Sequence, residues 1–258
     1  FNIRYGTAGD GDNEWQNRKE LVYTVIKDQN SDVVGLQEAL KFQIDEILEQ
    51  VPAYAKIGVG RDDGDSLGEY SAILYKKDKL EIVDSGTFWF SDTPDVIAST
   101  HWGNDITRIC TWGLFKEMAT QKLFYFYNLH LDHRSQPSRE KSAQLLMQKI
   151  ADRKEKVPFF ISGDFNAGED NPAITYLVDV DNAKKHKITP LVDSFRLLHS
   201  NAQDVGTFGG FKGRTSGPKI DYIFVPQNTN VIKAEIIHSN ENGRYPSDHY
   251  PVNAVVTF

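Results

Sequence analysis

Residues 157–166 read Val-Pro-Phe-Phe-Ile-Ser-Gly-Asp-Phe-Asn, a nearly all-apolar run that ends in an acid and an amide. Short apolar runs of this kind are typical of buried strands, and Gly163 permits close approach of a backbone or ligand. Because side chains two residues apart share one face of a strand, Asp164 and Asn166 project together. Such a pair can hold a phosphate or a nucleophilic water, although a plain turn is the alternative for this tetrapeptide alone. The stretch predicts a buried strand with polar chemistry at its end.

Two other predicted strands also end in polar residues. The strand over 32–37 leads to Glu38, whose side chain shares a face with two apolar residues. A surface glutamate is the alternative for that strand alone. The strand over 122–131 turns from aromatic to polar along one face and reaches His130. Its tail, His-Leu-Asp-His, could be a metal cluster, but a structural zinc site would have no cysteine support elsewhere.

The C-terminal third contains an acid that needs a partner. Asp221 shares a strand face with two apolar residues, and burying a carboxylate is costly without compensation. The later tripeptide Ser247-Asp248-His249 supplies an imidazole. A carboxylate that accepts from one imidazole nitrogen fixes the tautomer and raises the basicity of the other nitrogen. Asp221 and His249 therefore read as the acid–histidine half of a hydrolytic site, which does not require a nucleophile from the protein.

Strands and helices alternate along the chain without an interdomain linker or an internal repeat, so we expect a single domain over 1–258. The middle strands follow one another through short turns, which implies antiparallel pairing, and two strand clusters bounded by helices predict an α/β fold with more than one sheet layer. The expected helices lie near 14–29, 44–52, 138–154 and from 172, and the expected strands lie over 1–5, 32–37, 70–75, 81–90, 107–115, 122–131, 157–162, 220–225, 231–238 and 251–258.

Acidic residues outnumber basic ones by 36 to 29, giving a formal net charge of −7. A protein that works along a nucleic-acid backbone is expected to carry a broad basic surface, so the balance argues against non-specific binding to long nucleic acid. No apolar run is long enough to cross a bilayer, and we expect a soluble monomer. The single Cys110 excludes an internal disulfide. Residue 1 is Phe, so an export signal cannot be judged and the compartment stays open.

The order of the motifs is more specific than any one of them. It resembles the endonuclease/exonuclease/phosphatase superfamily, and most of all its compact, uncharacterised bacterial members. The resemblance spans essentially the whole chain and implies a four-layer α/β sandwich, with two central mixed sheets flanked by helices. The motifs that carry it are Phe1-Asn2-Ile3-Arg4, Leu36-Gln37-Glu38, Asn128-Leu129-His130, Gly163-Asp164-Phe165-Asn166, Ile220-Asp221-Tyr222 and Ser247-Asp248-His249.

The resemblance also implies a divalent cation, usually Mg²⁺, with Mn²⁺ as a plausible substitute. Glu38 would be the principal metal ligand, with Asn2 and Asp248 assisting. Oxygen ligands of this kind suit Mg²⁺, which retains several waters and bridges to substrate phosphate.

The catalytic residues implied by the resemblance are spread over the second half of the chain. Asp164 and Asn166 would position the attacking water or the phosphate, and His249, oriented by Asp221, would be the catalytic histidine. Whether His249 or Asp164 takes the proton from water stays open, with His249 favoured as the base, or as a charge-stabilising group if Asp164 is the base. His130 would contact the scissile phosphate at a place where apurinic endonucleases carry tyrosine, which puts apurinic-site activity in doubt.

The implied activity is metal-dependent hydrolysis of a phosphoester, as a phosphodiesterase or a phosphatase, by in-line attack of an activated water. The substrate would be a small molecule or an exposed nucleotide, and Arg108 and Arg139 are candidates to bind a second phosphate or a polar head group. Two alternatives remain. The first is a nuclease acting on DNA or RNA, and the second is a catalytically inactive binding module of the same fold.

Overall fold

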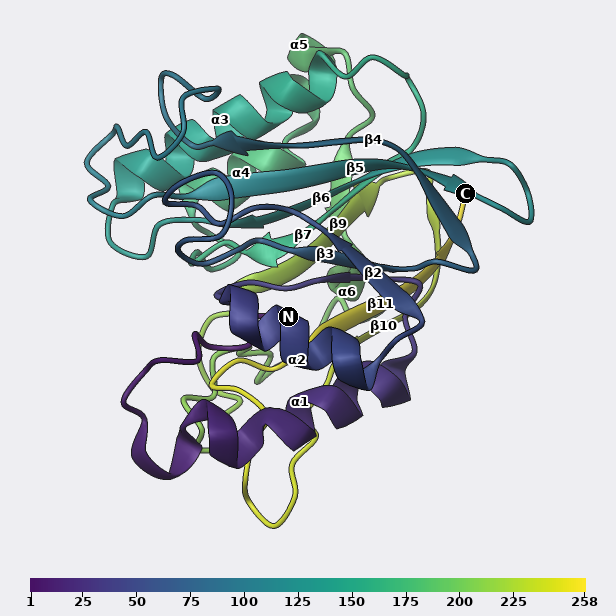
Figure 1. The fold of residues 1–258 in the computed structure, drawn as a ribbon. Helices are drawn as coiled ribbons and strands as arrows, with labels where there is room; N and C mark the ends of the chain where they lie inside the picture. The colour runs from purple at the N-terminus through teal and green to yellow at the C-terminus, as the bar shows by residue number, and fades with distance from the viewer.

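The computed structural model describes all 258 residues and consists of four layers, with two sheet layers between two helical layers (Figure 1). This is the α/β sandwich expected from the sequence. The helices are α1 (Trp15–Gln29), α2 (Lys41–Gln50), α3 (Gln136–Ala151), α4 (Pro172–Val178), α5 (Val180–His186) and α6 (Ser194–Leu198), and a 3-10 turn, η1 (Gly11–Asn13), precedes α1. In Figure 1, α3, α4 and α5 form one outer layer, and α1 and α2 form the other.

The larger sheet has six strands in the order β4-β5-β6-β7-β9-β8. β6 and β7 pair in parallel and every other neighbouring pair is antiparallel, so the sheet is mixed, as expected. Its strands are β4 (Leu80–Trp89), β5 (Ile109–Glu117), β6 (Leu123–His130), β7 (Phe159–Asp164), β8 (Leu191–Asp193) and β9 (Asp221–Pro226).

The second sheet layer is built from shorter pieces. One is the antiparallel sheet β1-β3-β2 and the other is the antiparallel hairpin of β10 and β11. Residues 1–3 add a parallel bridge between Asn2 and Gln37, where a longer strand over 1–5 was expected. That strand is cut short because Arg4 takes a left-handed backbone with φ of 56°. The strands of this layer are β1 (Val33–Gly35), β2 (Tyr54–Ile57), β3 (Ile73–Lys76), β10 (Asn230–Ile236) and β11 (Val252–Thr257).

Apolar side chains fill the space between successive layers. One cluster lies between the larger sheet and α3, α4 and α5, a second joins α1 and α2 to β1 and β3, and a third lies between the two sheet layers. In α1 the buried residues Trp15, Val22, Val25 and Ile26 recur at helical spacing, which is why this segment forms a helix with one face on the core. α3 begins at a serine cap, because the Ser135 side chain accepts from the Ser138 amide.

A polar contact joins the two sheet layers beneath the end where β6 and β7 finish. Asn128 of β6 is fully buried, and its Nδ2 donates to the carbonyl oxygens of Leu36 and Ala72, both at 2.9 Å. Its Oδ1 accepts from Gln37 Nε2 at 2.6 Å. A side chain at Gly35 would collide with Asn128, since an added Cβ would lie 2.5 Å from its Oδ1. This contact fixes the segment that leads to Glu38 against the larger sheet.

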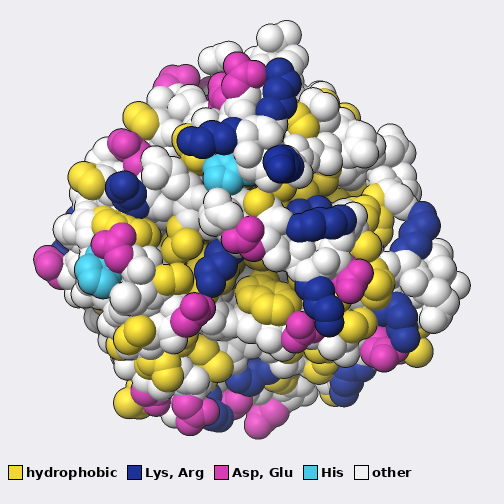
Figure 2. All heavy atoms as spheres, turned by 90° about the horizontal axis from the view of Figure 1, so that it is seen from above, with side chains coloured by type: hydrophobic (Ala, Val, Ile, Leu, Met, Phe, Trp, Pro, Cys, Tyr) yellow, Lys and Arg dark blue, Asp and Glu magenta, His cyan; other side chains and the backbone are white.

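The surface over α3 and α5 carries charges of both signs. In Figure 2, Lys and Arg are interspersed with Asp and Glu across this face, and neither sign forms a continuous patch. On this face, charges of opposite sign lie close together and partly cancel one another. None of the helices is both long and apolar enough to span a bilayer.

Candidate active site

Strand register brings three of the predicted residues together where the neighbouring strands β6, β7 and β9 of the larger sheet end or begin. His130, the last residue of β6, is the register partner of Asp164, the last residue of β7. Asp164 is in turn the register partner of Asp221, the first residue of β9. The sheet therefore aligns these three side chains before any loop contributes.

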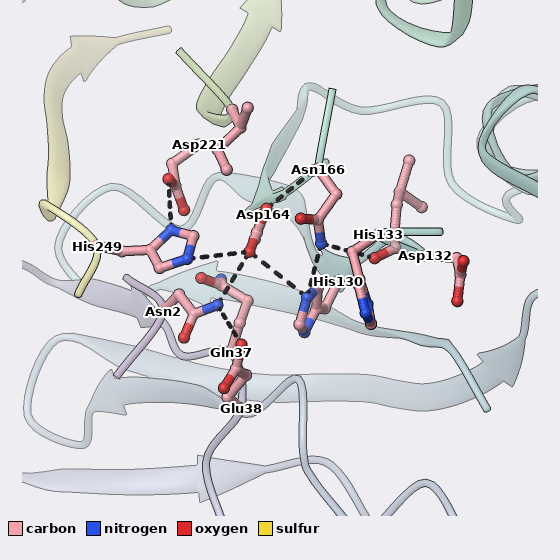
Figure 3. A network of polar contacts seen from close by, with 12 residues as sticks. Asn2, Gln37, Glu38, His130, Asp132, His133, Asp164, Asn166, Asp221 and His249 are labelled. Atoms are coloured by element: carbon pink, nitrogen blue, oxygen red, sulfur yellow. Dashed lines mark hydrogen bonds and ion pairs between the residues drawn. The ribbon is translucent and has the colours of Figure 1, made fainter. Parts of the chain in front are cut away.

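Asp164 lies at the centre of the polar network drawn in Figure 3. It is 1% exposed, and its Oδ2 accepts from Asn2 Nδ2 at 2.9 Å while its Oδ1 accepts from the backbone N–H of Asn166 at 2.9 Å. Two imidazole nitrogens flank the same carboxylate, with His130 Nε2 at 3.5 Å and His249 Nε2 at 3.7 Å. Burial, together with the charge of Asp221, raises the pKa of Asp164 to about 7. Asp164 is therefore poised between its two protonation states near neutral pH.

His249 is bonded to Asp221, as the sequence suggested. The Nδ1 of His249 lies 2.9 Å from Asp221 Oδ2, and both side chains are buried. Burial by itself lowers the pKa of His249, but the carboxylates of Asp221 and Asp164 outweigh it and raise the pKa to about 10. The imidazolium form, with protons on both nitrogens, is thus favoured between these two acids.

Glu38 reaches the same centre from the second sheet layer. Its Oε1 accepts from Asn2 Nδ2 at 2.9 Å and its Oε2 accepts from the backbone N–H of Tyr5 at 3.2 Å. Its own backbone is left-handed, with φ of 57°. One ligand atom each from Glu38, Asp164 and His249 lies within 4.8 Å of the other two. Carboxylate oxygens gathered in this way fit a hard divalent cation.

The electrostatics of the cluster also fit a cation. Burial raises the pKa of Asp248, and nearby Glu38 raises it further. Burial likewise is the main cause of the raised pKa of Asp164, and both carboxylates would be stabilised in their charged form by a cation. Asn2 fits less directly, because its nitrogen faces both Glu38 and Asp164 and its Oδ1 accepts from the Arg4 amide.

Arg4 is a residue of this cluster that the sequence analysis missed. Its guanidinium lies 4.0 Å from Glu38 and 3.9 Å from Asp248, and it forms a two-pronged pair with Asp10 at 2.9 Å. The available signal was its place two residues after Asn2 in the first motif. Arg4 partly balances the acids in the cation-free chain.

On the other side of Asp164, His130 contacts Asn166. The Nδ2 of Asn166 lies 3.0 Å from His130 Nε2 and also donates to the carbonyl oxygen of Leu131 at 3.0 Å. Behind the ring, His130 Nδ1 is buried without a hydrogen-bond partner and lies 3.9 Å from Glu69 Oε2. Burial and then the charges of Arg108 and Arg61 hold the pKa of His130 well below its usual range, so this ring is neutral. Glu69 is the second residue that sequence reasoning missed.

The two predicted substrate-binding arginines differ in position. Arg108 is 2% exposed, lies 3.5 Å from Asp132 and contacts His133 Nδ1 at 2.9 Å, while its Nη1 has no partner. It therefore borders the His130 side of the site. Arg139 instead bonds to the Asp132 carbonyl at 2.8 Å and to Gln136 at 2.6 Å, so its guanidinium is occupied at the start of α3.

An apolar cavity lies apart from this polar cluster. It has a volume of about 410 Å³, lies between β1 and β11, and is lined mainly by apolar side chains. None of the predicted site residues lines it. The candidate catalytic side chains therefore lie outside this cavity, at the strand ends where His130, Asp164 and Asp221 meet.

Comparisons with known proteins agree with the fold described above. The model of the Endonuclease/Exonuclease/phosphatase family matches residues 1–249. An endonuclease/exonuclease/phosphatase from Bacteroides vulgatus is 35% identical with a TM-score of 0.89, covering 100% of this chain and 96% of that one. The mannosyl-6-phosphatase of Bacteroides thetaiotaomicron is 33% identical with a TM-score of 0.88, covering 100% of this chain and 97% of that one.

More distant proteins match as well. An uncharacterised protein of Acanthamoeba polyphaga mimivirus is 27% identical in an alignment 253 residues long, and the match covers 93% of this chain and 91% of that protein. The catalytic domain of human Nocturnin is 17% identical with a TM-score of 0.73, covering 99% of this chain and 92% of that one, and so shares the fold alone. Because the family model spans nearly the whole sequence and the two Bacteroides structures match it from end to end, the chain belongs to the endonuclease/exonuclease/phosphatase family of phosphoester hydrolases.

Proposed function

We propose that this chain hydrolyses phosphate monoesters of small polar molecules, sugar phosphates foremost, with the help of a divalent cation such as Mg²⁺ or Mn²⁺. The observation that carries the proposal is the cluster of half-buried Glu38 with buried Asp164 and His249, whose ligand atoms lie within 4.8 Å of one another. The choice of a sugar monoester is supported by the mannosyl-6-phosphatase, which is 33% identical over the whole chain.

Glu38 would hold the cation, with Asp248 close by and Asn2 joining if its amide turns its oxygen inward. When bound, a divalent cation polarises the phosphoryl oxygens and stabilises the charge that develops on them. The carboxylates meet its preference for oxygen ligands.

The chain's own residues divide the proton chemistry between them. Asp221 holds the imidazole of His249 through Nδ1, which leaves Nε2 facing Asp164. Since the raised pKa keeps His249 protonated, it serves best as a cation that stabilises the phosphoryl charge. Asp164, with a pKa raised to about 7, is then the group that takes the proton from the attacking water. The sequence favoured His249 as the base, whereas the raised pKa values of both groups favour Asp164.

A nuclease is the weaker candidate. The net charge of −7 and the mixed-sign face in Figure 2 offer no extended basic track for a phosphate backbone. A single exposed nucleotide or a sugar phosphate places fewer demands on the surface, because only the phosphate must reach the cluster.

The test is phosphate release from mannose 6-phosphate and p-nitrophenyl phosphate, compared with bis-p-nitrophenyl phosphate and a single-stranded oligonucleotide. Each is assayed with Mg²⁺, Mn²⁺, Ca²⁺ or EDTA. We expect release from the monoesters that EDTA abolishes and that Glu38→Gln loses together with Mg²⁺ binding in calorimetry. Preferred cleavage of the oligonucleotide would favour the nuclease. An absence of both turnover and metal binding would mean a binding module.

A further inference from the structure

Arg18, near the start of α1, is a buried cation whose hydrogen-bond partners are all uncharged. It is 2% exposed, and its guanidinium donates to four main-chain carbonyl oxygens. They are the carbonyls of Asn13 at 2.9 Å, Ile3 at 2.7 Å, Arg4 at 3.0 Å and Pro246 at 2.8 Å. Because burying a charge is costly without compensation, these bonds are what keep the guanidinium inside the protein.

Three of the four carbonyls belong to the two segments that carry the predicted cation ligands Asn2 and Asp248. Two of them directly follow Asn2 in the chain, and the carbonyl of Pro246 lies two residues before Asp248. One nitrogen of Arg18, Nη1, donates to a carbonyl of each segment. The guanidinium therefore joins the amino-terminal segment to the segment that leads to Asp248.

A third segment near the site packs on the same guanidinium. The Cζ of Arg18 lies 5.6 Å from the ring centroid of Phe211 and 5.3 Å from that of Trp15, so both rings stabilise the cation. Two residues before Phe211, the backbone N–H groups of residues 209–210 donate to the Asp248 carbonyl at 2.8 and 2.9 Å. The loop that supports Asp248 is thus also in contact with Arg18.

The bonds of Arg18 require an arginine. Its planar guanidinium has five N–H donors in a fixed fork, whereas lysine has three donors on one flexible nitrogen. Burial lowers the pKa of Arg18 to about 10, although the charge of Asp248 opposes the shift. The guanidinium therefore keeps all its donors at neutral pH. No other ionisable side chain could bind these carbonyls in the same plane.

We propose that Arg18 is a positioning residue of the cation site, which holds two backbone segments together so that Asn2 and Asp248 stay beside Glu38. The inference rests on the proposed function, because it assigns Arg18 a role toward the same cation. A second bond, from Ser247 Oγ to the Asn2 carbonyl at 2.7 Å, joins the same two segments. Without the guanidinium, three carbonyls lose a shared donor, and the predicted ligands move apart although none of them is changed.

Calorimetry with Mg²⁺ on Arg18→Lys and Arg18→Gln provides the first test. Loss of groups that orient metal ligands costs about 10-fold to 100-fold in metal affinity. We expect both variants to raise the Kd for Mg²⁺ by that factor, since lysine keeps only the charge and glutamine loses the charge and the fork. If Arg18 acted through its charge alone, Arg18→Gln would bind Mg²⁺ more tightly and Arg18→Lys would bind like the wild type. That result would overturn the inference.

Arg153→Lys is the matched control. Arg153 also donates to main-chain carbonyls, those of Ile150 at 2.7 Å and Val157 at 3.1 Å, and lies 4.8 Å from the ring centroid of Phe159. It follows α3, outside the cation site, so the Kd for Mg²⁺ should not change. With p-nitrophenyl phosphate, Arg18→Lys should lose activity at limiting Mg²⁺ and regain most of it at saturating Mg²⁺. A general loss of folded protein would not produce this dependence.

Hydrogen exchange of the cation-free chain tests the positioning without metal. We expect backbone amides in 2–5 and 247–250 to exchange faster in Arg18→Lys and not in Arg153→Lys. Ser247→Ala removes the second bond between the same segments, and we expect the same two changes from it if Arg18→Lys does not fold. An unchanged Kd or unchanged exchange would overturn the inference. If the wild type neither binds Mg²⁺ nor hydrolyses a monoester while exchange rises as expected, the proposed function fails and the hold of Arg18 on the two segments stands.

Discussion

His249 and His130 flank the same carboxylate at nearly the same distance, 3.7 and 3.5 Å from Asp164, yet their surroundings are opposite in charge. Both rings are buried, at 5% and 6% exposed. His249 faces Asp221 and Asp164, which raise its pKa to about 10. His130 is buried beside Arg108 and Arg61, which help to hold its pKa well below the usual range. The neighbours of a buried histidine, rather than the residue type, decide whether it is a cation or a neutral hydrogen-bonding group.

This difference divides the site into two halves. The His249 half is cationic, and the His130 half is neutral and contacts Asn166. Asp164 belongs to both, since it contacts each ring and accepts the backbone N–H of Asn166. A substitution can therefore change the His249 half alone, the His130 half alone, or Asp164, which they share.

Removing the shared group should have the largest effect. In the proposed mechanism Asp164 accepts the proton from water, so we expect Asp164→Asn to lower kcat on a phosphate monoester by about 10²-fold to 10⁴-fold. Asp179→Asn is the control, because Asp179 caps α5 through the Asn182 amide and lies outside the site. A loss of less than about tenfold in Asp164→Asn, on the same scale, would contradict its assignment as the base.

The two histidines should differ when replaced by the same residue. We expect His249→Gln to lower kcat by about 10²-fold to 10³-fold, since it removes a positive charge from the reacting centre. We expect His130→Gln to lower it by only about 10-fold to 100-fold, since His130 orients another side chain. Steady-state kinetics of both variants under one set of conditions provides the measurement. Equal decreases of kcat in the two variants would contradict the proposed difference between the two histidines.

The stability of the cation-free chain should respond to pH in opposite directions through the two rings. The folded pKa of His249 is raised, so its stabilisation is fully present below an unfolded pKa of about 6.5 and is lost as pH rises through about 10. The folded pKa of His130 is lowered, so stability is lost as pH falls below that unfolded value, because only the unfolded chain takes the proton.

Urea denaturation in EDTA at pH 5, 7 and 9.5 would measure both effects. Relative to wild type, His249→Gln should flatten the decline at high pH and His130→Gln should flatten the decline at low pH. Parallel curves for the three proteins would show that the two surroundings do not differ in charge as described.

The smallest effect is expected at the two arginines. Arg108 keeps an N–H without a partner beside the His130 half, so Arg108→Gln should raise KM by about fivefold, in line with a net contribution of about 1 kcal/mol for one hydrogen bond. Arg139 is engaged by Asp132 and Gln136, and Arg139→Gln should leave KM unchanged. An increase of KM in Arg139→Gln alone would reverse this assignment.

The order of strands and helices could be predicted from the sequence because it rests on local signals, namely apolar period and turn residues. β2, β8, α5 and α6 escaped prediction, and each has seven residues or fewer. Asp164, Asp221 and Glu38 could be found because each shares a strand face with apolar residues, which makes a charge conspicuous. Their specific roles remain predictions.

Glu69 and Arg61 could not be found in this way. They lie on either side of a polar loop, and their meaning depends on His130, which is distant in the sequence. The difference between Arg108 and Arg139 likewise arises from tertiary contacts, since both read as isolated arginines in the sequence. Tertiary contacts between residues distant in the sequence produce no periodic pattern from which they could be predicted.

The left-handed backbone of Glu38 has an evolutionary consequence. A residue with a Cβ pays roughly 1 kcal/mol or more to adopt φ of 57°, and glycine would adopt it without that cost. The strain persists only as long as selection needs the carboxylate at that spot. In a lineage freed from hydrolysis, drift should replace this residue early, with glycine as the favoured successor. A homologue with glycine at the position of Glu38 would therefore be expected to keep the fold and to have lost the proposed hydrolytic activity.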